Sequence, residues 1–288
     1  FYCNVRIKAP YQATSIACKG RAGLGYEFYA GSMPQVVNNT NRNFCTSIMA
    51  TEDGTTVTVN DYNPGVVFER LGGGIFADAL TIFMNKGDCF VFTGYSSTTP
   101  TNMAGFIGAH ITSNNPIVVN TGNYMGSIHF EGFQDGGMVQ IVPINLLGTE
   151  HVVVEGEGVD IMERPIVVAV TDGTSIYLND IAAPVATIDE GEYYLVPSSY
   201  YDDGLHNNMA ITTNVPAYVY QCTAANTSSA TSEFNYIPPL ECYLTSSIDA
   251  IPDITEADGT CTTMDLKYWD FRFSNLCNFK CRSCGPAY

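Results

Sequence analysis

Positively charged residues are scarce in this sequence of 288 residues. It holds 12 lysines and arginines against 29 aspartates and glutamates, which gives a formal net charge of −17 at pH 7. Proteins that bind nucleic acid or anionic membrane surfaces present clustered lysines and arginines. The composition therefore argues against both kinds of partner and favours a secreted or surface protein whose charge keeps it in solution.

Long apolar runs and catalytic motifs are also absent. No stretch approaches the roughly 18 consecutive apolar residues of a membrane-spanning helix. The chain has no G-x-S-x-G or H-E-x-x-H motif, and its histidines are too far apart along the chain for a local zinc motif. We therefore predict that the protein is not an enzyme and has no membrane span. The histidines are His110, His129, His151 and His206, of which the first and third lie in strand-like runs and are expected to be structural.

Four segments of the chain occur twice in the same order, which indicates an internal duplication. The pairs are LGYEFYA from Leu24 and LGTEHVV from Leu147, ATEDGTTVTVN from Ala50 and AVTDGTSIYLN from Ala169, GDCFVF from Gly87 and GEYYLV from Gly191, and ITSNNPIVV from Ile111 and ITTNVPAYV from Ile211.

The duplicated segments have the pattern of β-strands. β-branched and aromatic residues alternate with polar ones in TTVTVN and TSIYLN, and an Asp-Gly dipeptide, typical of tight turns, precedes each. Pro116 and Pro216 are expected to open the last strand of each copy. No helical periodicity longer than two turns occurs before Thr255. The prediction is an all-β fold of tandem β-sandwich-like repeats of about 100 residues. A propeller-like β array is the alternative.

The domain boundaries follow from the same matches. NYIPPLECY from Asn235 resembles VQIVPINLL from Val139, so a third unit is predicted to begin there and to break off. An interrupted unit leaves unpaired strand edges, which predicts that neighbouring chains cover this region in an oligomer or a larger particle. The predicted parts are 1–21 (leading strands), 22–135 (first β repeat), 136–234 (second β repeat), 235–263 (start of a truncated third unit, and a seam between Ile254 and Met264) and 264–288 (a short unrelated tail).

The tail contains three closely spaced cysteines, Cys277, Cys281 and Cys284. A C-x₃-C-x₂-C run can direct three thiolates at one iron–sulfur cluster. The stretch LKYWDFRFSNLCNFKCRSCGP resembles the cluster-binding opening of radical S-adenosylmethionine enzymes, over about residues 264–286. That resemblance implies a [4Fe–4S] cluster with S-adenosylmethionine as cofactor. The barrel that should follow is missing, so we predict that the tail is a fragment that binds no cluster.

The remaining cysteines are candidates for disulfides in a secreted protein. Cys3 with Cys18, and Cys222 with Cys242, are the local pairs. Buried free cysteines in a reducing compartment are the alternative.

Acidic clusters and tyrosines supply the remaining candidate sites. EGEG from Glu155, DEGE from Asp189 and YYDDG from Tyr200 offer oxygen ligands for calcium, although they have no EF-hand spacing and solvated turns are the favoured explanation. Eighteen tyrosines concentrate near expected loop ends, and Tyr200 and Tyr201 are the candidate recognition residues. Aromatic packing inside the sandwiches and between neighbouring strands is the favoured explanation of the tyrosines as a group.

Several segments also resemble a known family. VPINLLGTEHVV, TDGTSIYLN, ITSNNPIVV and YIPPLECYLTSSIDAIPDI are similar to the IgG-Fc-binding-protein N-terminal domain family, over about residues 5–254. The resemblance implies an extracellular β module with no catalytic residues. We therefore predict a non-catalytic structural or adhesive β module on a cell or virion surface, acting in recognition of proteins or glycans. A fragment of a radical S-adenosylmethionine enzyme and a carbohydrate-binding module are the alternatives.

Overall fold

The computed structural model describes residues 3–9, 12–34, 43–70, 73–95, 100–126, 128, 135–156, 158, 162–202, 207–224 and 233–240. In these residues the chain forms β-strands and short 3₁₀ helices, which confirms the predicted all-β class. Among the described residues, no helix has both the length and the apolar character needed to cross a membrane. The tail with Cys277, Cys281 and Cys284 lies outside the described residues, as do Cys242, His129 and His206.

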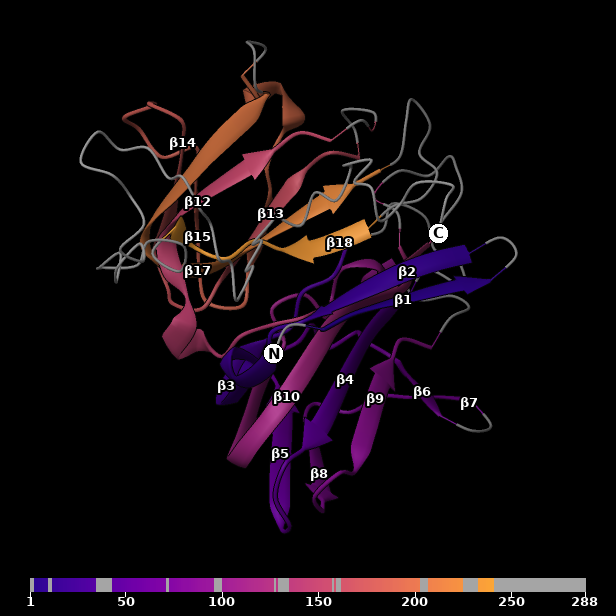
Figure 1. Ribbon diagram of the computed structural model, residues 1–288. Helices are drawn as coiled ribbons and strands as arrows, with labels where there is room; N and C mark the ends of the chain where they lie inside the picture. Colours follow the sequence, from indigo (N-terminus) through magenta and orange to yellow (C-terminus); the bar gives the residue numbers. More distant parts are fainter. Residues whose placement is uncertain are drawn as a thin grey trace, which may run out of the picture.

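Two seven-stranded sheets follow one another along the chain, and Figure 1 shows them as an indigo-to-magenta body and a pink-to-orange body. The first sheet contains β3 (Leu24–Tyr29), β4 (Phe44–Ala50), β5 (Thr55–Asn60), β8 (Leu80–Met84), β9 (Cys89–Thr93), β10 (His110–Gly126) and β11 (Asp135–Gln140). The second contains β12 (Gly148–Val154), β13 (Pro165–Ala169), β14 (Thr174–Leu178), β15 (Ala186–Ile188), β16 (Tyr193–Leu195), β17 (Asn208–Thr223) and β18 (Glu233–Tyr236).

The two sheets have the same topology. The strand order β8-β5-β10-β4-β9, with β3 and β11 also on β10, returns as β15-β14-β17-β13-β16, with β12 and β18 on β17. Each repeated sequence segment therefore occupies the same place in both sheets, and the predicted tandem repeat is confirmed. The propeller-like alternative is not observed, because each unit is built around one long central strand rather than as a small blade.

Smaller elements complete the described structure. The strands β1 (Cys3–Ala9) and β2 (Gln12–Cys18) form a separate hairpin, and β6 (Phe68–Arg70) pairs with β7 (Gly73–Ile75). The 3₁₀ helices are η1 (Gly20–Gly23), η2 (Pro100–Met103), η3 (Ile144–Leu146) and η4 (Ser198–Tyr200).

Each central strand pairs with two successive strands on each of its edges. On β10 the register with β3 shifts between Thr112 and Ile117, and along the other edge pairing with β5 ends at Ser113 and pairing with β4 begins at Ile117. Pro116 lies in this interval, inside β10, and Pro216 lies inside β17. The expectation that these prolines open their strands is therefore wrong. A proline is tolerated inside the strand because the exchange of partners interrupts the ladder at that point.

The recurrent Asp-Gly dipeptides and asparagines stabilise the position where the central strand changes its pairing partner. Asn114 accepts a hydrogen bond from the backbone N–H of Thr56 at 2.7 Å and donates one to the carbonyl of Gly54 at 3.1 Å. In the second repeat Asn214 makes the same two bonds, to Ser175 at 2.7 Å and to Gly173 at 3.1 Å. The repeated Asp-Gly turn and its asparagine partner therefore have a structural role in both repeats.

The last strand of each sheet lies slightly beyond the predicted boundaries. β11 pairs with β10 and continues the first sheet to Gln140, and β18 pairs with β17. Asn235 therefore lies in the closing strand of the second repeat.

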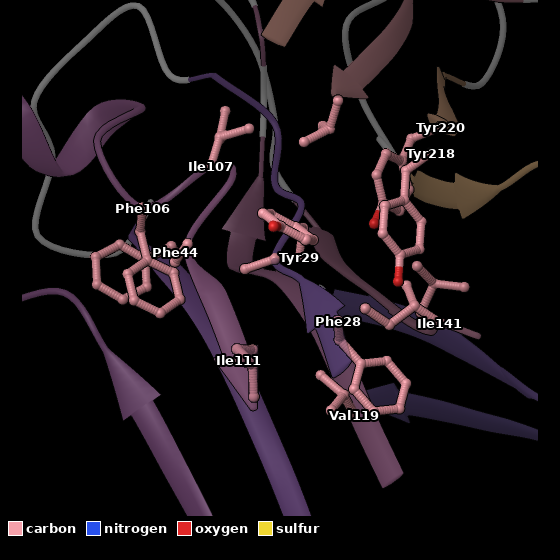
Figure 2. Packing of buried hydrophobic residues seen from close by; sticks show 14 of the residues in the cluster. Phe28, Tyr29, Phe44, Phe106, Ile107, Ile111, Val119, Ile141, Tyr218 and Tyr220 are labelled. Carbon is pink, nitrogen blue, oxygen red and sulfur yellow. The ribbon is translucent and has the colours of Figure 1, made fainter. Parts of the chain in front are cut away.

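One hydrophobic cluster contains residues of both repeats, and a second cluster lies within the second repeat. Tyr218 and Tyr220 of β17 lie beside Ile141 of the first repeat in Figure 2, and all three are fully buried. The Tyr218 hydroxyl donates a 2.6 Å hydrogen bond to the carbonyl of Val142. A Cβ at Gly31 would come within 2.6 Å of the Tyr220 ring, so the first repeat leaves space for this side chain. The repeats are therefore packed together through aromatic contacts rather than joined only by a linker.

Candidate recognition surface

An open cavity of about 860 Å³ lies on the second repeat. It is formed by the ends of β12, β14 and β17 and by the segment around η4. The residues that line it are Glu155, Asn179, Asp180, Ser198, Ser199, Tyr200, Tyr201, Asp202, Asn207, Asn208 and Ala210.

Side-chain amides hold the cavity walls together. Asn179, at the end of β14, accepts a hydrogen bond from the backbone N–H of Ala210 at 3.0 Å and donates one to the carbonyl of Tyr200 at 2.8 Å. Asn207 donates to Glu155 Oε2 at 3.0 Å. Asn179 and Asn207 both have positive φ, 51° and 38°, a conformation that asparagine tolerates better than most residues. The local sequence therefore fixes the shape of the cavity.

The two candidate tyrosines have different environments. Tyr200 is half-buried and lines the cavity. Tyr201 is only 9 % exposed, belongs to the core of the second repeat, and its hydroxyl accepts a hydrogen bond from Gln221 Nε2 at 3.2 Å. Burial, and secondarily the carboxylate of Glu163, raises the pKa of Tyr201. Of the two, Tyr200 is the one with a side chain accessible to a partner.

The described lining of the cavity is acidic and contains no lysine or arginine. Its three carboxylates are Glu155, Asp180 and Asp202. No group of three or more histidine, cysteine, aspartate or glutamate side chains in the described part of the chain could hold a metal ion. The described structure therefore gives the calcium prediction no support at this cavity.

In the DEGE stretch, the carboxylates bond to backbone and to a tyrosine. Asp189 accepts from the N–H of Gly173 at 3.0 Å, and Glu192 accepts from the N–H of Asp189 at 2.9 Å. Glu190 accepts from the hydroxyl of Tyr29 at 2.6 Å. These contacts are those of a structured turn, the alternative that the sequence left open.

The corresponding surface of the first repeat is occupied. The aligned strands place Asn60 and Asp61 where the second repeat has Asn179 and Asp180, and Gly108 where it has Asn208. On the first repeat this surface receives the turn between β15 and β16. A Cβ at Gly108 would lie 1.8 Å from the carbonyl oxygen of Gly191, so the two backbones are in close contact. The cavity is thus the uncovered copy of a surface that is already used once within the molecule.

Comparison with known proteins assigns a family. A family model described as IgGFc binding protein matches residues 13–266, which is most of the chain. The chain belongs to the IgGFc-binding protein family. No curated protein and no solved structure matches it. The family match includes the stretch from Ile254 to Met264 where a seam is predicted, and no comparison supports the resemblance of residues 264–286 to radical S-adenosylmethionine enzymes.

In this member of the IgGFc-binding protein family, two buried ionisable groups lie away from the cavity lining. His151 on β12 is 1 % exposed, and neither ring nitrogen has a hydrogen-bond partner in the described residues. Its register opposite Ile211 matches that of Phe28 opposite Ile111, so it occupies an aromatic core position. Burial lowers the pKa of His151 to about 4. This residue is therefore a neutral core histidine rather than a ligand.

The second group is Glu163, whose side chain is fully buried. It accepts hydrogen bonds from the backbone N–H groups of Gly156, Gly158 and Ala224 at 3.3, 3.1 and 2.9 Å. Burial raises the pKa of Glu163, and these three bonds oppose the shift. The carboxylate ties the segment after β12 to the end of β17, which is a structural role.

The structure describes only some of the cysteines for which disulfides are predicted. Cys3 and Cys18 are directly opposite each other in the β1–β2 ladder. Cys222 is fully buried in β17, and its proposed partner Cys242 lies outside the described residues. Burial raises the pKa of Cys222 and disfavours a reactive thiolate.

Sequence reasoning found Tyr200 but missed Asn179, Asp180 and Asn207. The alignment of the two repeats was the available signal, because Asn179 and Asp180 match Asn60 and Asp61. This match indicates an open binding surface on the second repeat only once it is known that the surface around Asn60 and Asp61 is covered.

Proposed function

We propose that this chain is an extracellular, non-catalytic β module that binds other protein chains as part of a cell-surface or virion-surface assembly. One observation carries the proposal: two corresponding surfaces of the molecule differ in their coverage. The face of the first repeat around Tyr29 and Gly108 is covered by the second repeat, whereas the same face of the second repeat is a cavity of about 860 Å³. Family membership and the acidic composition support an extracellular role.

The surroundings of the cavity favour a protein ligand. Val152 and Val154 of β12 are 41 % and 36 % exposed and point to the same side of the strand. Among the described strands, β12 pairs with β17 alone, so one of its edges is available. Exposed aliphatic side chains beside an available strand edge are features of surfaces that bind another polypeptide.

A carbohydrate ligand is the second candidate. The lining combines the partly exposed ring of Tyr200 with the amide and carboxylate groups of Asn207 and Asp202. Aromatic faces and planar polar side chains are the groups that hold sugars. The burial of Tyr201 weakens this candidate, because it leaves one ring rather than two at the surface.

Binding to immobilised arrays distinguishes a protein ligand from a carbohydrate ligand. The labelled chain is applied to an array of extracellular proteins that includes immunoglobulin Fc fragments, and in parallel to a glycan array. We expect reproducible protein signals that Val152→Glu abolishes and that Tyr124→Ala, a change at an exposed tyrosine outside the cavity, leaves intact.

Glycan signals that disappear in Tyr200→Ala, without protein signals, would support the carbohydrate-binding module instead. An absence of reproducible signal on the protein array would count against the proposal. Turnover of S-adenosylmethionine by the purified chain under reducing, oxygen-free conditions would contradict the non-catalytic assignment.

A further inference from the structure

The contact between the two repeats shows how a unit of this kind docks onto another. The turn between β15 and β16, Asp189–Glu192, lies against Tyr29 and Gly108 of the first repeat. Glu190 at its tip accepts the hydroxyl of Tyr29, and Gly191 approaches the backbone of Gly108.

The first repeat carries the same turn, between β8 and β9. In Asn85–Asp88, the N–H of Asn85 bonds to the side chain of Asp88 at 2.8 Å, as Asp189 does to Glu192 at 2.9 Å. The N–H of the next residue bonds to the aspartate of the Asp-Gly dipeptide at 3.0 Å in both repeats. Gly87 and Gly191 both have positive φ, 86° and 77°. The two turns are therefore copies of one docking element.

The turn of the first repeat is uncovered and has the opposite charge at its tip. Lys86 is exposed and occupies the position of Glu190. A Cβ at Gly87 would meet no atom within 4 Å, so the described residues leave its surroundings open.

The surface that would receive this turn is the cavity of the second repeat. Relative to the first repeat, Val152 replaces Tyr29 and Asn208 replaces Gly108. Because Asn208 has a side chain where a Cβ at Gly108 would meet the docked turn, a turn in the cavity cannot approach the backbone as closely as Gly191 approaches Gly108. The donor hydroxyl that bonds to Glu190 is also absent, because Val152 takes the place of Tyr29. In its place the cavity presents the carboxylates of Glu155, Asp180 and Asp202.

We propose that the Lys86 turn of one copy of this chain inserts into the acidic cavity on the second repeat of another copy. The interaction deepens the proposed function, on which it rests, by naming the partner as a second copy of the chain. Charge fixes the pairing: the turn with Glu190 at its tip would be repelled by the cavity, whereas the Lys86 turn is attracted to it. Docking of one end onto a different end is heterologous, so the product is a head-to-tail ring or filament.

The remaining contact area comes from the β4–β9 side of the first sheet. Met49 and Val91 are 39 % and 54 % exposed, and they occupy the positions of Val168 and Leu195, which pack against the first repeat inside the molecule. The β1–β2 hairpin lies over β11, where Lys19 and Gln140 are hydrogen-bonded through the Lys19 backbone. The new interface therefore repeats the contacts that β13 and β16, the counterparts of β4 and β9, make inside the molecule. It does not repeat those of β18, because its counterpart β11 is covered by the hairpin.

Sedimentation velocity of the whole chain over a concentration series tests this arrangement. Wild-type chain is expected to show a sedimentation coefficient that rises with concentration and falls back with added salt, because salt screens the charge pairing. Lys86→Glu and Asp180→Lys should each weaken association roughly tenfold or more. The double variant Lys86→Glu with Asp180→Lys should recover it. Arg21→Glu, with the same charge change at another exposed cation, is the matched control and should associate like the wild type.

A monomer at every concentration up to about 100 µM, well above the dissociation constants of most specific interfaces, would overturn the proposal. Equal association of Lys86→Glu and Arg21→Glu would do so as well, as would a double variant that stays as weak as either single one. Protein signals on the array that persist for a monomeric chain would leave the proposed function standing and remove only the self-association.

Discussion

The hydroxyl of Tyr29 donates a 2.6 Å hydrogen bond to Oε1 of Glu190 and thereby joins the first repeat to a turn of the second. The ring of Tyr29 stacks on His110, with centroids 4.5 Å apart, and His110 Nε2 lies 2.8 Å from Glu27 Oε1. Burial, together with the hydrogen bond to Glu190, raises the pKa of Tyr29, so its hydroxyl remains a donor at physiological pH. The two repeats are thus fixed by a directional contact as well as by the hydrophobic cluster that they share.

Tyr29→Phe removes the donor and keeps the ring. We expect a loss of about 1 kcal/mol in the free energy of unfolding, because a hydrogen bond to a partly exposed carboxylate contributes at the modest end of the range. Urea denaturation followed by circular dichroism measures the change. Tyr177→Phe on β14, whose hydroxyl makes no hydrogen bond to the first repeat among the described residues, is the matched control. Equal midpoints for the two variants would show that the bond does not stabilise the pair.

Gly108→Ala tests the close backbone contact between the repeats. The new Cβ would lie 1.8 Å from the carbonyl oxygen of Gly191, and the backbone has φ of +81°. Gly54→Ala is the control, because Gly54 has φ of +67° but nothing within 4 Å of its Cβ. We expect Gly54→Ala to cost about 1 kcal/mol from the backbone alone and Gly108→Ala to cost at least about 2 kcal/mol more. Similar urea midpoints would contradict the contact.

The strands could be predicted because their alternation is local. In β5 and β14, buried residues alternate with partly exposed ones as the pattern of TTVTVN and TSIYLN requires. The positions of Pro116 and Pro216 could not be, because a proline inside a strand is explained only by the exchange of partners on either side of it.

The cavity could not be predicted from the sequence, because no local sequence pattern determines which side chains are exposed there. Tyr200 and Tyr201 are adjacent, chemically identical and both at the cavity, yet Tyr200 is partly exposed there whereas Tyr201 is buried in the core of the second repeat. Their difference arises from η4, where the chain turns between the cavity and Gln221. Whether a repeat surface is covered or open is likewise a property of the whole array.

Cys3 and Cys18 are expected to form a disulfide in the oxidised protein. They are partners in an antiparallel ladder, where Cα atoms are about 4.5–5.5 Å apart, a separation that suits a disulfide. Peptide mapping without reductant should recover the two residues in one linked peptide. Separate alkylated peptides from protein that was never exposed to reductant would show that the pair is not bridged.

His151 predicts a component of stability that depends on pH. Its pKa is lowered to about 4 by burial, below the ordinary value near 6.5 that it has in the unfolded chain. Between these two values the unfolded state binds a proton that the folded state does not, so stability falls as the pH falls from about 6.5 to 4. His151→Phe supplies the side chain that the first repeat has at this position, Phe28, and removes the titration.

We therefore expect the variant to gain more stability over the wild type at pH 5 than at pH 8, by about 1–2 kcal/mol. The titrating carboxylates cancel in this difference because both proteins carry them. Urea midpoints at the two pH values measure it, and an equal difference at pH 5 and pH 8 would show that His151 is not held neutral in the core.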